Sequence, residues 1–421
     1  MQLSLKILPC VAALLCAAAC SNCGNAPENK FASDEAFLKQ HSDAVVLRLG
    51  KAAAIVVPAW QGRIMTLTDN VDTGESFGWI NRPAISEGVL SPERAKGTLK
   101  EHIHAFGGEE RFWLAPEGGQ FSFYFGPGAK FEFSEWKVPA ALDTEPFKLT
   151  SLGGDYAEFS KSMEIANYSG TRFWMQCDRK VRLLDSASLK SAMNLKFDES
   201  KVSMVAAETQ NRVKNAGKNA WVPESGLPAI WLLGMFNVSD SAVIAVPLKA
   251  ATGGKSRRVI DDYFGKISPD RFKIAGNVAF LKADGKSRGK IGVPPGSSKG
   301  IAAAYDPETK TLTFVASFPS PDASARYVNN LWSIQKDPYS GDAVSAYNDG
   351  PVDGTQMGPF FELETTSPAM ALKPGQTFSH NQITAHFRGD AAELNRICNA
   401  LLGVDLEFLS GVFKACDPAK K

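Results

Sequence analysis

The chain has 421 residues, of which 44% are hydrophobic and 22% are charged, with 36 glycines and 24 prolines. This length allows one large domain or two to three ordinary ones, since a domain commonly takes about 150 residues. The formal net charge of +1 gives no electrostatic reason to expect nucleic acid or another polyanion as a partner, so composition favours a neutral one.

The first 19 residues have the pattern of a bacterial signal peptide, and Cys20 that of a lipidation site. Lys6 precedes an apolar run from Ile7 to Ala19, which is too short for a membrane-spanning helix of about 20 apolar residues. The small residues before Cys20 resemble a lipobox, in which the cysteine is lipidated and becomes the new N-terminus; simple cleavage after Ala19 is the alternative. Residues 20–33 are polar, as a short tether should be. We therefore expect an exported protein with a lipid anchor in the cell envelope, facing the periplasm or the cell exterior.

Residues 34–390 are predicted to form an all-β domain, a large antiparallel β-sandwich that begins with a short N-terminal helix. Ser33 can cap this helix, and Asp34 and Glu35 suit its positive end. The segments that follow alternate apolar and polar residues or are rich in β-branched residues, which predicts strands. They are residues 43–50, 52–60, 62–69, 119–126, 130–136, 156–167, 171–185, 310–318 and 377–387. Because no helical pattern separates them, an antiparallel sandwich is favoured over a parallel sheet.

Residues 391–421 are predicted to form a C-terminal helical segment, in which Leu394, Ile397 and Leu401 recur at helical spacing. Cys398 and Cys416 could form a disulfide in an oxidising compartment. The body of the chain contains no Cys/His cluster of zinc spacing, so no structural zinc is expected.

The segment HIHAFGGEERFWLAPEGG, residues 102–119, contains the donors of a metal site. If it is a strand, His102 and His104 lie on one face, and Glu109 would complete a set of ligands for a transition metal. The order comes close to the first metal motif of cupins, but the second motif is not reproduced. Histidines that bond loop carbonyls are the other interpretation, so we expect no metal and no cofactor and keep these three residues as an alternative.

The same segment also supplies the residue types of a sugar site. A sugar presents an apolar face and a rim of hydroxyls, so its binding site needs an aromatic surface beside side chains that form paired hydrogen bonds. Arg111, Trp113 and Glu117 meet this description. A core tryptophan and a surface ion pair of Arg111 are the alternative.

A second segment of this kind spans residues 331–354 and is bounded by Gly and Pro. It carries Trp332, Tyr347, Asn348 and Asp349. Asn-Asp-Gly is also a turn signal, so a purely structural role stays open.

Glu362 and Glu364 are two residues apart on a predicted strand and should share one face. Two like charges so close are costly unless one is exposed, protonated or paired with a cation. The pair is therefore a candidate acid/base site.

This last region resembles the C-terminal part of the galactose mutarotase-like (aldose 1-epimerase-like) superfamily. There a Leu-Glu-Thr strand precedes a Pro-containing loop and a Leu-x-Pro-Gly-Glu turn, and this chain has LET at 363–365 and LKPGQ at 372–376. GRIMTLT (62–68) and GMFNVS (234–239) resemble two further strands of that superfamily. More narrowly, the signatures GRIMT, YNDGP and ELETTSP resemble those of a family of exported bacterial proteins of unknown function with this fold.

The resemblance implies a mutarotase-like sandwich and a proton-transfer site. In a mutarotase a glutamate takes the proton from the anomeric hydroxyl while a histidine protonates the ring oxygen. Glu364 matches the base, but Leu233 and Gly234 stand where the acid histidine is expected. Ordinary mutarotase activity is therefore not expected unless a histidine from another strand, such as His104 or His380, takes that place.

The sequence thus predicts an envelope-tethered carbohydrate-binding protein. A sugar epimerase or other carbohydrate-active enzyme with Glu364 as base is one alternative, and a metal-dependent enzyme using His102, His104 and Glu109 is another. The candidate catalytic residues are Glu364, His104 and His380. The candidate ligand-binding residues are Arg63, His102, Arg111, Trp113, Glu117, Asp262, Trp332, Tyr347, Asn348, Asp349 and Glu362.

Overall fold

The computed structural model describes residues 30–250, 259–318, 320, 322, 324–352 and 354–414. The predicted signal peptide, Cys20 and most of the predicted tether lie outside these described residues, as does Cys416. The lipidation site and the Cys398–Cys416 disulfide therefore stay predictions. Within the described ranges no helix has the length and hydropathy of a membrane span.

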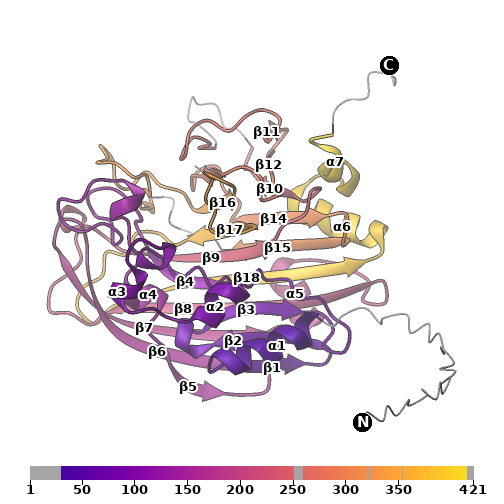
Figure 1. Ribbon diagram of the computed structural model, residues 1–421. Coiled ribbons are helices and arrows are strands. Elements are labelled where there is room, and N and C mark those ends of the chain that lie inside the picture. The colour runs from indigo at the N-terminus through magenta and orange to yellow at the C-terminus, as the bar shows by residue number, and fades with distance from the viewer. Residues whose placement is uncertain are drawn as a thin grey trace, which may run out of the picture.

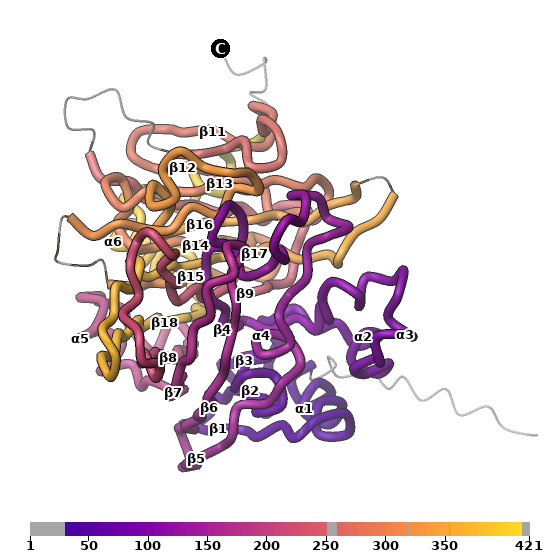
Figure 2. The backbone as a smooth tube through the Cα atoms, turned by 90° about the vertical axis from the view of Figure 1, so that its left-hand side faces the viewer, coloured from indigo at the N-terminus to yellow at the C-terminus, as the bar shows by residue number. Residues whose placement is uncertain are grey.

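The strands form three sheets (Figure 1). All of the strand pairs are antiparallel, as the alternating sequence pattern predicted. The largest has ten strands and runs from β11 at one edge to β5 at the other, at the top and bottom of Figure 2. In spatial order they are β11 (Phe272–Ala275), β12 (Val278–Lys282), β10 (Val243–Pro247), β14 (Ile301–Asp306), β15 (Thr311–Ser317), β18 (Thr377–Gly389), β8 (Val202–Asn215), β7 (Arg172–Leu183), β6 (Tyr156–Ala166) and β5 (Lys148–Leu152).

The second sheet has five strands and packs against the first. Its order is β13 (Gly289–Val293), β16 (Val344–Asn348), β17 (Phe360–Thr366), β9 (Ala229–Asn237) and β4 (Arg111–Ala115). Between the two sheets, Ile244 and Ala304 of the large sheet share a core with Val344 and Leu363 of the small one. The molecule is therefore an all-β sandwich, as predicted.

A third sheet of three strands closes the side of the sandwich near β6 to β8. It contains β1 (Val45–Leu49), β2 (Ala52–Val57) and β3 (Arg63–Thr68). The helix α1 (Lys30–His41) covers its other face through Phe31 and Leu38, which pack with Ile55. Strands β2 and β3 are buried on both faces because they lie between this helix and the sandwich.

The C-terminal helices cover the outer face of the ten-stranded sheet, on the right of Figure 1. Helix α6 (Ala391–Leu402) is capped by Asp390 and buries the predicted residues Leu394, Ile397 and Leu401, and α7 (Leu406–Gly411) follows it. Cys398 is buried in this packing. Its Sγ donates a hydrogen bond to the carbonyl of Val404 at 3.3 Å.

Several local predictions were wrong. Helix α1 starts at Lys30, so Ser33 lies inside it rather than capping it, and the short helices α2 (Arg82–Glu87), α3 (Pro92–Ala95), α4 (Ala140–Asp143) and α5 (Ser186–Met193) had no clear sequence signal. Residues 119–126 and 130–136 form a loop and one 3₁₀ turn (Phe133–Glu135) instead of strands. Their alternating aromatic residues anchor the loop in the core: Phe123 packs on Phe173, and Phe125 packs on Trp332. The period of two therefore reports buried side chains here, not sheet pairing.

Candidate functional site

The outer face of the five-stranded sheet gathers most of the chemistry that the sequence singled out. In this sheet Arg111 of β4 is directly opposite Leu233 of β9, which is opposite Glu364 of β17. Since side chains alternate between faces, the residues two positions away lie on the same side. That face therefore carries Arg111, Trp113, Trp231, Leu233, Met235, Glu362, Glu364, Tyr347 and Lys290.

A cavity of about 340 Å³ lies on this face, a size that suits a small organic ligand. Aromatic side chains form much of its wall: Trp113, Phe133, Trp136, Trp231, Phe264, Trp332 and Tyr347. Those from the sheet form the floor, while Phe133 and Trp136 come from the loop that the sequence predicted to be a strand. The backbone nitrogen of Glu117 donates to the side chain of Asn330 at 2.8 Å, which ties residues 102–119 to the residue directly before the segment 331–354.

Two buried ion pairs cross the floor. The guanidinium of Arg111 donates to the carboxylate of Glu362, and Lys290 Nζ lies 3.0 Å from Oε2 of Glu364. Trp231 Nε1 donates to the same oxygen at 2.9 Å. Each glutamate thus has its own cation, which offsets part of the like-charge cost that their spacing implied.

The environment changes the proton affinity of these groups. Burial raises the pKa of Glu362 to about 7, against the lowering effect of Arg111 and with a further rise from Glu364. Burial also raises the pKa of Glu117. The pKa of Lys290 is raised: burial alone would lower it, but the carboxylates of Glu364, Glu117 and Glu362 outweigh burial. A glutamate with a pKa near neutrality can both take and give a proton at neutral pH.

The two glutamates differ in their access to the cavity. Glu362 lines it, whereas Glu364 is 0% exposed and is not part of the wall. The Lys290 ammonium and the Trp231 indole nitrogen both donate hydrogen bonds to the Glu364 carboxylate. Glu364, which the resemblance matched to the catalytic base, therefore lies behind the wall, whereas Glu362 faces the cavity.

Several buried polar atoms at or directly behind this wall have no hydrogen-bond partner among the described residues. They include Nε of Arg111, Oε1 of Glu364 and the indole nitrogens of Trp113 and Trp136. Leaving a buried donor or acceptor without a partner costs about 1–3 kcal/mol each. Each such atom in a folded protein calls for a specific explanation, of which a functional role is one.

No histidine stands at the position where the resemblance places the acid histidine, which is occupied by Leu233 and Gly234. Leu233 lines the cavity with an apolar side chain. A Cβ at Gly234 would lie 2.2 Å from the carbonyl oxygen of Glu109, so the backbones of β9 and the chain before β4 approach too closely for any side chain there. The glycine is required by this contact.

The two candidate catalytic histidines lie elsewhere. His104 Nδ1 is 2.9 Å from the carboxylate of Asp143. His380 lies between the sheets, with Nε2 2.9 Å from the hydroxyl of Thr365. Thr365 follows Glu364 on the strand, so its side chain points to the opposite face. The structure thus brings neither histidine to Glu364.

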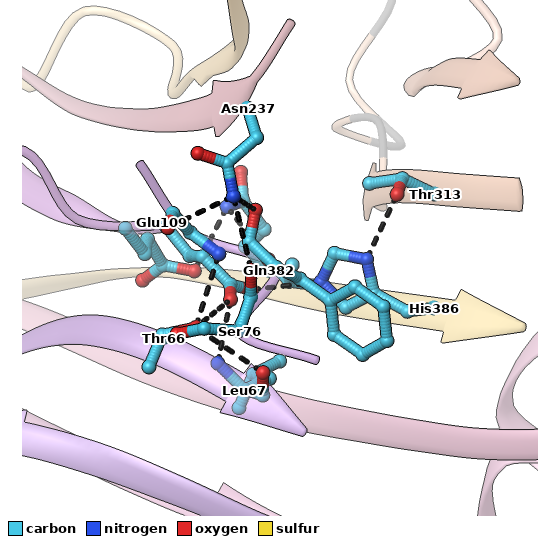
Figure 3. A network of polar contacts seen from close by, with 12 residues as sticks. Thr66, Leu67, Ser76, Glu109, Asn237, Thr313, Gln382 and His386 are labelled. Carbon is cyan, nitrogen blue, oxygen red and sulfur yellow. Dashed lines mark hydrogen bonds and ion pairs between the residues drawn. The ribbon is translucent and has the colours of Figure 1, made fainter. Parts of the chain in front are cut away.

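The alternative metal site is not formed. His102 contacts the carbonyl of Trp136 at 2.7 Å, and His104 turns to Asp143, because residues 102–106 are irregular rather than a strand. Glu109 points between the sheets, where its Oε2 is 2.8 Å from His386 Nε2 and its other oxygen accepts from Leu67 N (Figure 3). Among the described residues, no group of three His, Cys, Asp or Glu side chains could hold a metal.

Three further candidates also lie away from the cavity. Arg63 is buried and donates to the carbonyl of Gly107 at 2.9 Å. Asn348 is on the inner face of β16, where its side chain binds the loop at Gly285 and Ser287. Asp262 is exposed and does not line the cavity.

The cavity also contains residues that the sequence analysis missed, among them Trp136, Trp231, Phe264, Arg288, Lys290 and Met357. Trp231 lies on β9 and Lys290 on β13. That their side chains share a face with Glu364 becomes clear only when the cross-strand register is known. A larger cavity of about 520 Å³ lies beside α1 and β14, but none of the predicted ligand-binding residues lines it.

Comparison with known proteins places the chain in a family. A family model described as a family of unknown function (DUF6786) matches residues 29–413. The chain belongs to this family. No curated protein matches it in sequence.

Solved structures similar to the chain include galactose mutarotase-like proteins, as the sequence resemblance predicted. A galactose mutarotase-like protein from Lactobacillus casei ATCC 334 is 11% identical, with 82% of this chain and 99% of that chain covered and a TM-score of 0.45. The Slr1438 protein from Synechocystis sp. PCC 6803 is 12% identical, with 83% and 96% covered and a TM-score of 0.49. A putative mutarotase (YeaD) from Salmonella typhimurium is 12% identical, with 82% and 90% covered and a TM-score of 0.41. Because these identities and scores are low, the proposals below depend on the cavity of this chain.

Proposed function

We propose that the protein binds a carbohydrate in the cavity on the outer face of the five-stranded sheet, and that it does so while tethered to the cell envelope through a lipid on Cys20. The observation that carries the proposal is the combination of an aromatic wall with a floor of buried, oriented charges. The apolar face of a pyranose packs on aromatic rings, and its hydroxyls bond carboxylates and guanidinium groups. Ordinary mutarotase activity is not part of the proposal, because no histidine among the described residues lines this cavity.

Binding can be measured by thermal unfolding and calorimetry of the purified protein against a panel of mono- and oligosaccharides. A sugar present at about 100 times its dissociation constant adds roughly 2.7 kcal/mol to the free energy of unfolding, which raises the midpoint by a few degrees. We expect one class of sugar to raise the unfolding midpoint in this way. Addition of a chelator should leave the shift unchanged, because the proposed site binds the sugar through side chains alone.

Replacing Trp332 by alanine should weaken this binding by about tenfold or more. Trp332 lines the cavity from a loop and stacks on Trp136, with ring centroids 5.9 Å apart, so the change removes part of the sugar-packing surface. Trp174→Ala is the matched control, because Trp174 is 44% exposed on β7 and does not line the cavity. Equal affinity of the Trp332 variant and wild type would contradict the proposed site.

A sugar-converting activity is the second candidate function, and one observation favours it. Glu362 faces the cavity and has a pKa of about 7, suited to general acid/base work on a bound sugar. If turnover is found, Glu362→Gln should lower kcat by about 100-fold or more, within the usual contribution of such a group. Glu364→Gln tests the base implied by the superfamily resemblance. Full activity of the Glu362 variant would leave Glu364 as the candidate.

The tether has a separate test. In cells fed a labelled fatty acid, the wild-type chain should carry label and fractionate with membranes, because a lipidated cysteine holds a protein to a bilayer. The Cys20→Ser variant should lose both the fatty-acid label and the fractionation with membranes. Label retained in this variant, or a wild-type chain cleaved after Ala19 without lipid, would argue against the anchor.

A further inference from the structure

The described part of the cavity wall holds three cations, and only two of them form an ion pair with a carboxylate. Arg111 pairs with Glu362, and Lys290 pairs with Glu364. The third is Arg288, just before β13, which lines the same cavity. Among the described residues it has no ion pair and no hydrogen bond, and its Nε is buried without a partner.

Arg288 is nevertheless held in place. Its guanidinium carbon lies 3.7 Å from the centroid of the Phe264 ring, a close cation–π contact. Stacking of this kind fixes the plane of the guanidinium and leaves its edge donors available. The wall therefore presents an oriented, charged set of donors that forms no hydrogen bond with any residue in the described part of the chain.

Neither of the remaining carboxylates of the wall, Asp349 and Glu117, forms an ion pair with Arg288, although the charge of Arg288 lowers the pKa of each. Asp349 already accepts hydrogen bonds from the hydroxyl of Tyr347 at 2.6 Å and from the backbone nitrogen of Gly358 at 3.0 Å. Burial raises the pKa values of Asp349 and Glu117, which works against their charged forms. With the other two glutamates paired with Arg111 and Lys290, Arg288 is the cation of the wall that has no ion-pair partner among the described residues.

We propose that the bound sugar carries an anionic group, a carboxylate or a phosphate ester, which pairs with Arg288. This inference rests on the proposed carbohydrate site and narrows its ligand class. A planar guanidinium matches a carboxylate or phosphate with two parallel hydrogen bonds. The net charge of +1 favoured a neutral partner, but that number averages the whole chain and does not describe one wall.

Calorimetry with the purified full-length protein tests this with four probes: galacturonate, galactose 6-phosphate, galactose and acetate. We expect one or both anionic sugars to bind at least about tenfold more tightly than galactose, which is the contribution of one charge-assisted pair. The first two probes distinguish a carboxylate from a phosphate ester. Raising sodium chloride from about 50 mM to about 500 mM should reduce the preference, because salt screens the pair.

Arg288→Gln should weaken binding of the anionic sugars more than it weakens binding of galactose, so that the preference is lost, and Arg288→Lys should keep part of it. Arg326→Gln is the matched control: its exposed ion pair with Asp337 lies outside the cavity, so the preference should persist. Circular dichroism and the unfolding midpoint of each variant establish that it is folded.

Each contrary result has a distinct meaning. Binding of galactose as tight as that of both anionic sugars overturns the inference and leaves the carbohydrate site standing. The same holds if the preference survives in Arg288→Gln. Binding of acetate as tight as galacturonate overturns the inference, since the anion alone would then suffice. Failure of every sugar in the larger panel overturns the proposed function itself.

Discussion

Replacing Arg179 by methionine is expected to lower the free energy of unfolding by about 3–5 kcal/mol, the usual effect of removing one partner of a buried ion pair. Arg179 Nη2 lies 2.8 Å from Oε1 of Glu110, and both side chains are 0% exposed. Its Nε also donates to the carbonyl of Gly62 at 3.0 Å. The variant leaves the charge of Glu110 buried without a cation, and urea unfolding of the purified protein would measure the loss.

The same strand provides a matched control. Arg182 lies three residues further along β7 and pairs with Glu208 at 2.8 Å, but its side chain is 44% exposed. Arg182→Met should therefore cost no more than about 1 kcal/mol. The double variant Arg179→Met, Glu110→Gln should recover part of the loss, because the uncompensated charge is gone. Equal effects of the two single arginine variants would mean that burial does not govern this pair.

Opposite pH dependences are expected from Glu362 and His380. Burial raises the pKa of Glu362 from 4.5 to about 7, so between these values the folded state holds a proton that the unfolded chain has released. The contribution of Glu362 to the free energy of unfolding is therefore lost as pH rises from 4.5 to 7. The loss is roughly 3 kcal/mol, since one pKa unit corresponds to about 1.4 kcal/mol.

For His380 the direction is reversed. Burial lowers its pKa from 6.5 to about 4, so the unfolded chain binds the proton first. Stability is lost as pH falls from 6.5 to 4, by a similar amount. In the wild type the two contributions oppose each other over the shared range.

Single variants separate the two contributions. Urea unfolding from about pH 4 to pH 8 should show that Glu362→Gln loses stability more steeply than wild type on acidification, and that His380→Gln loses less. The readout is the slope with pH rather than the absolute stability, because Glu362→Gln also removes the partner of Arg111. Curves parallel to that of the wild type would show that these groups do not titrate as described.

The relation between pattern and structure is clearest in the strands. Residues 156–167 and 171–185 alternate because β6 and β7 bury one face, and both strands form where predicted. Residues 119–126 alternate equally well, yet Phe123 and Phe125 insert into the core from a loop without a neighbouring strand. Alternation reports which side chains are buried, whereas a strand also requires a partner backbone.

For the site, the sequence alone predicted that residues 102–119 and 331–354 carry binding chemistry, and it determined that Glu362 and Glu364 share a face. Only the tertiary structure decided which of these residues meet. Cross-strand register brings Arg111 to Glu362, and Lys290 and Trp231 to Glu364, while it turns His380 to the other side of β17. The physical reason is that local spacing fixes the face of a side chain within its own strand. The neighbours across a sheet come from distant parts of the chain, and they are fixed by the packing of the whole sandwich.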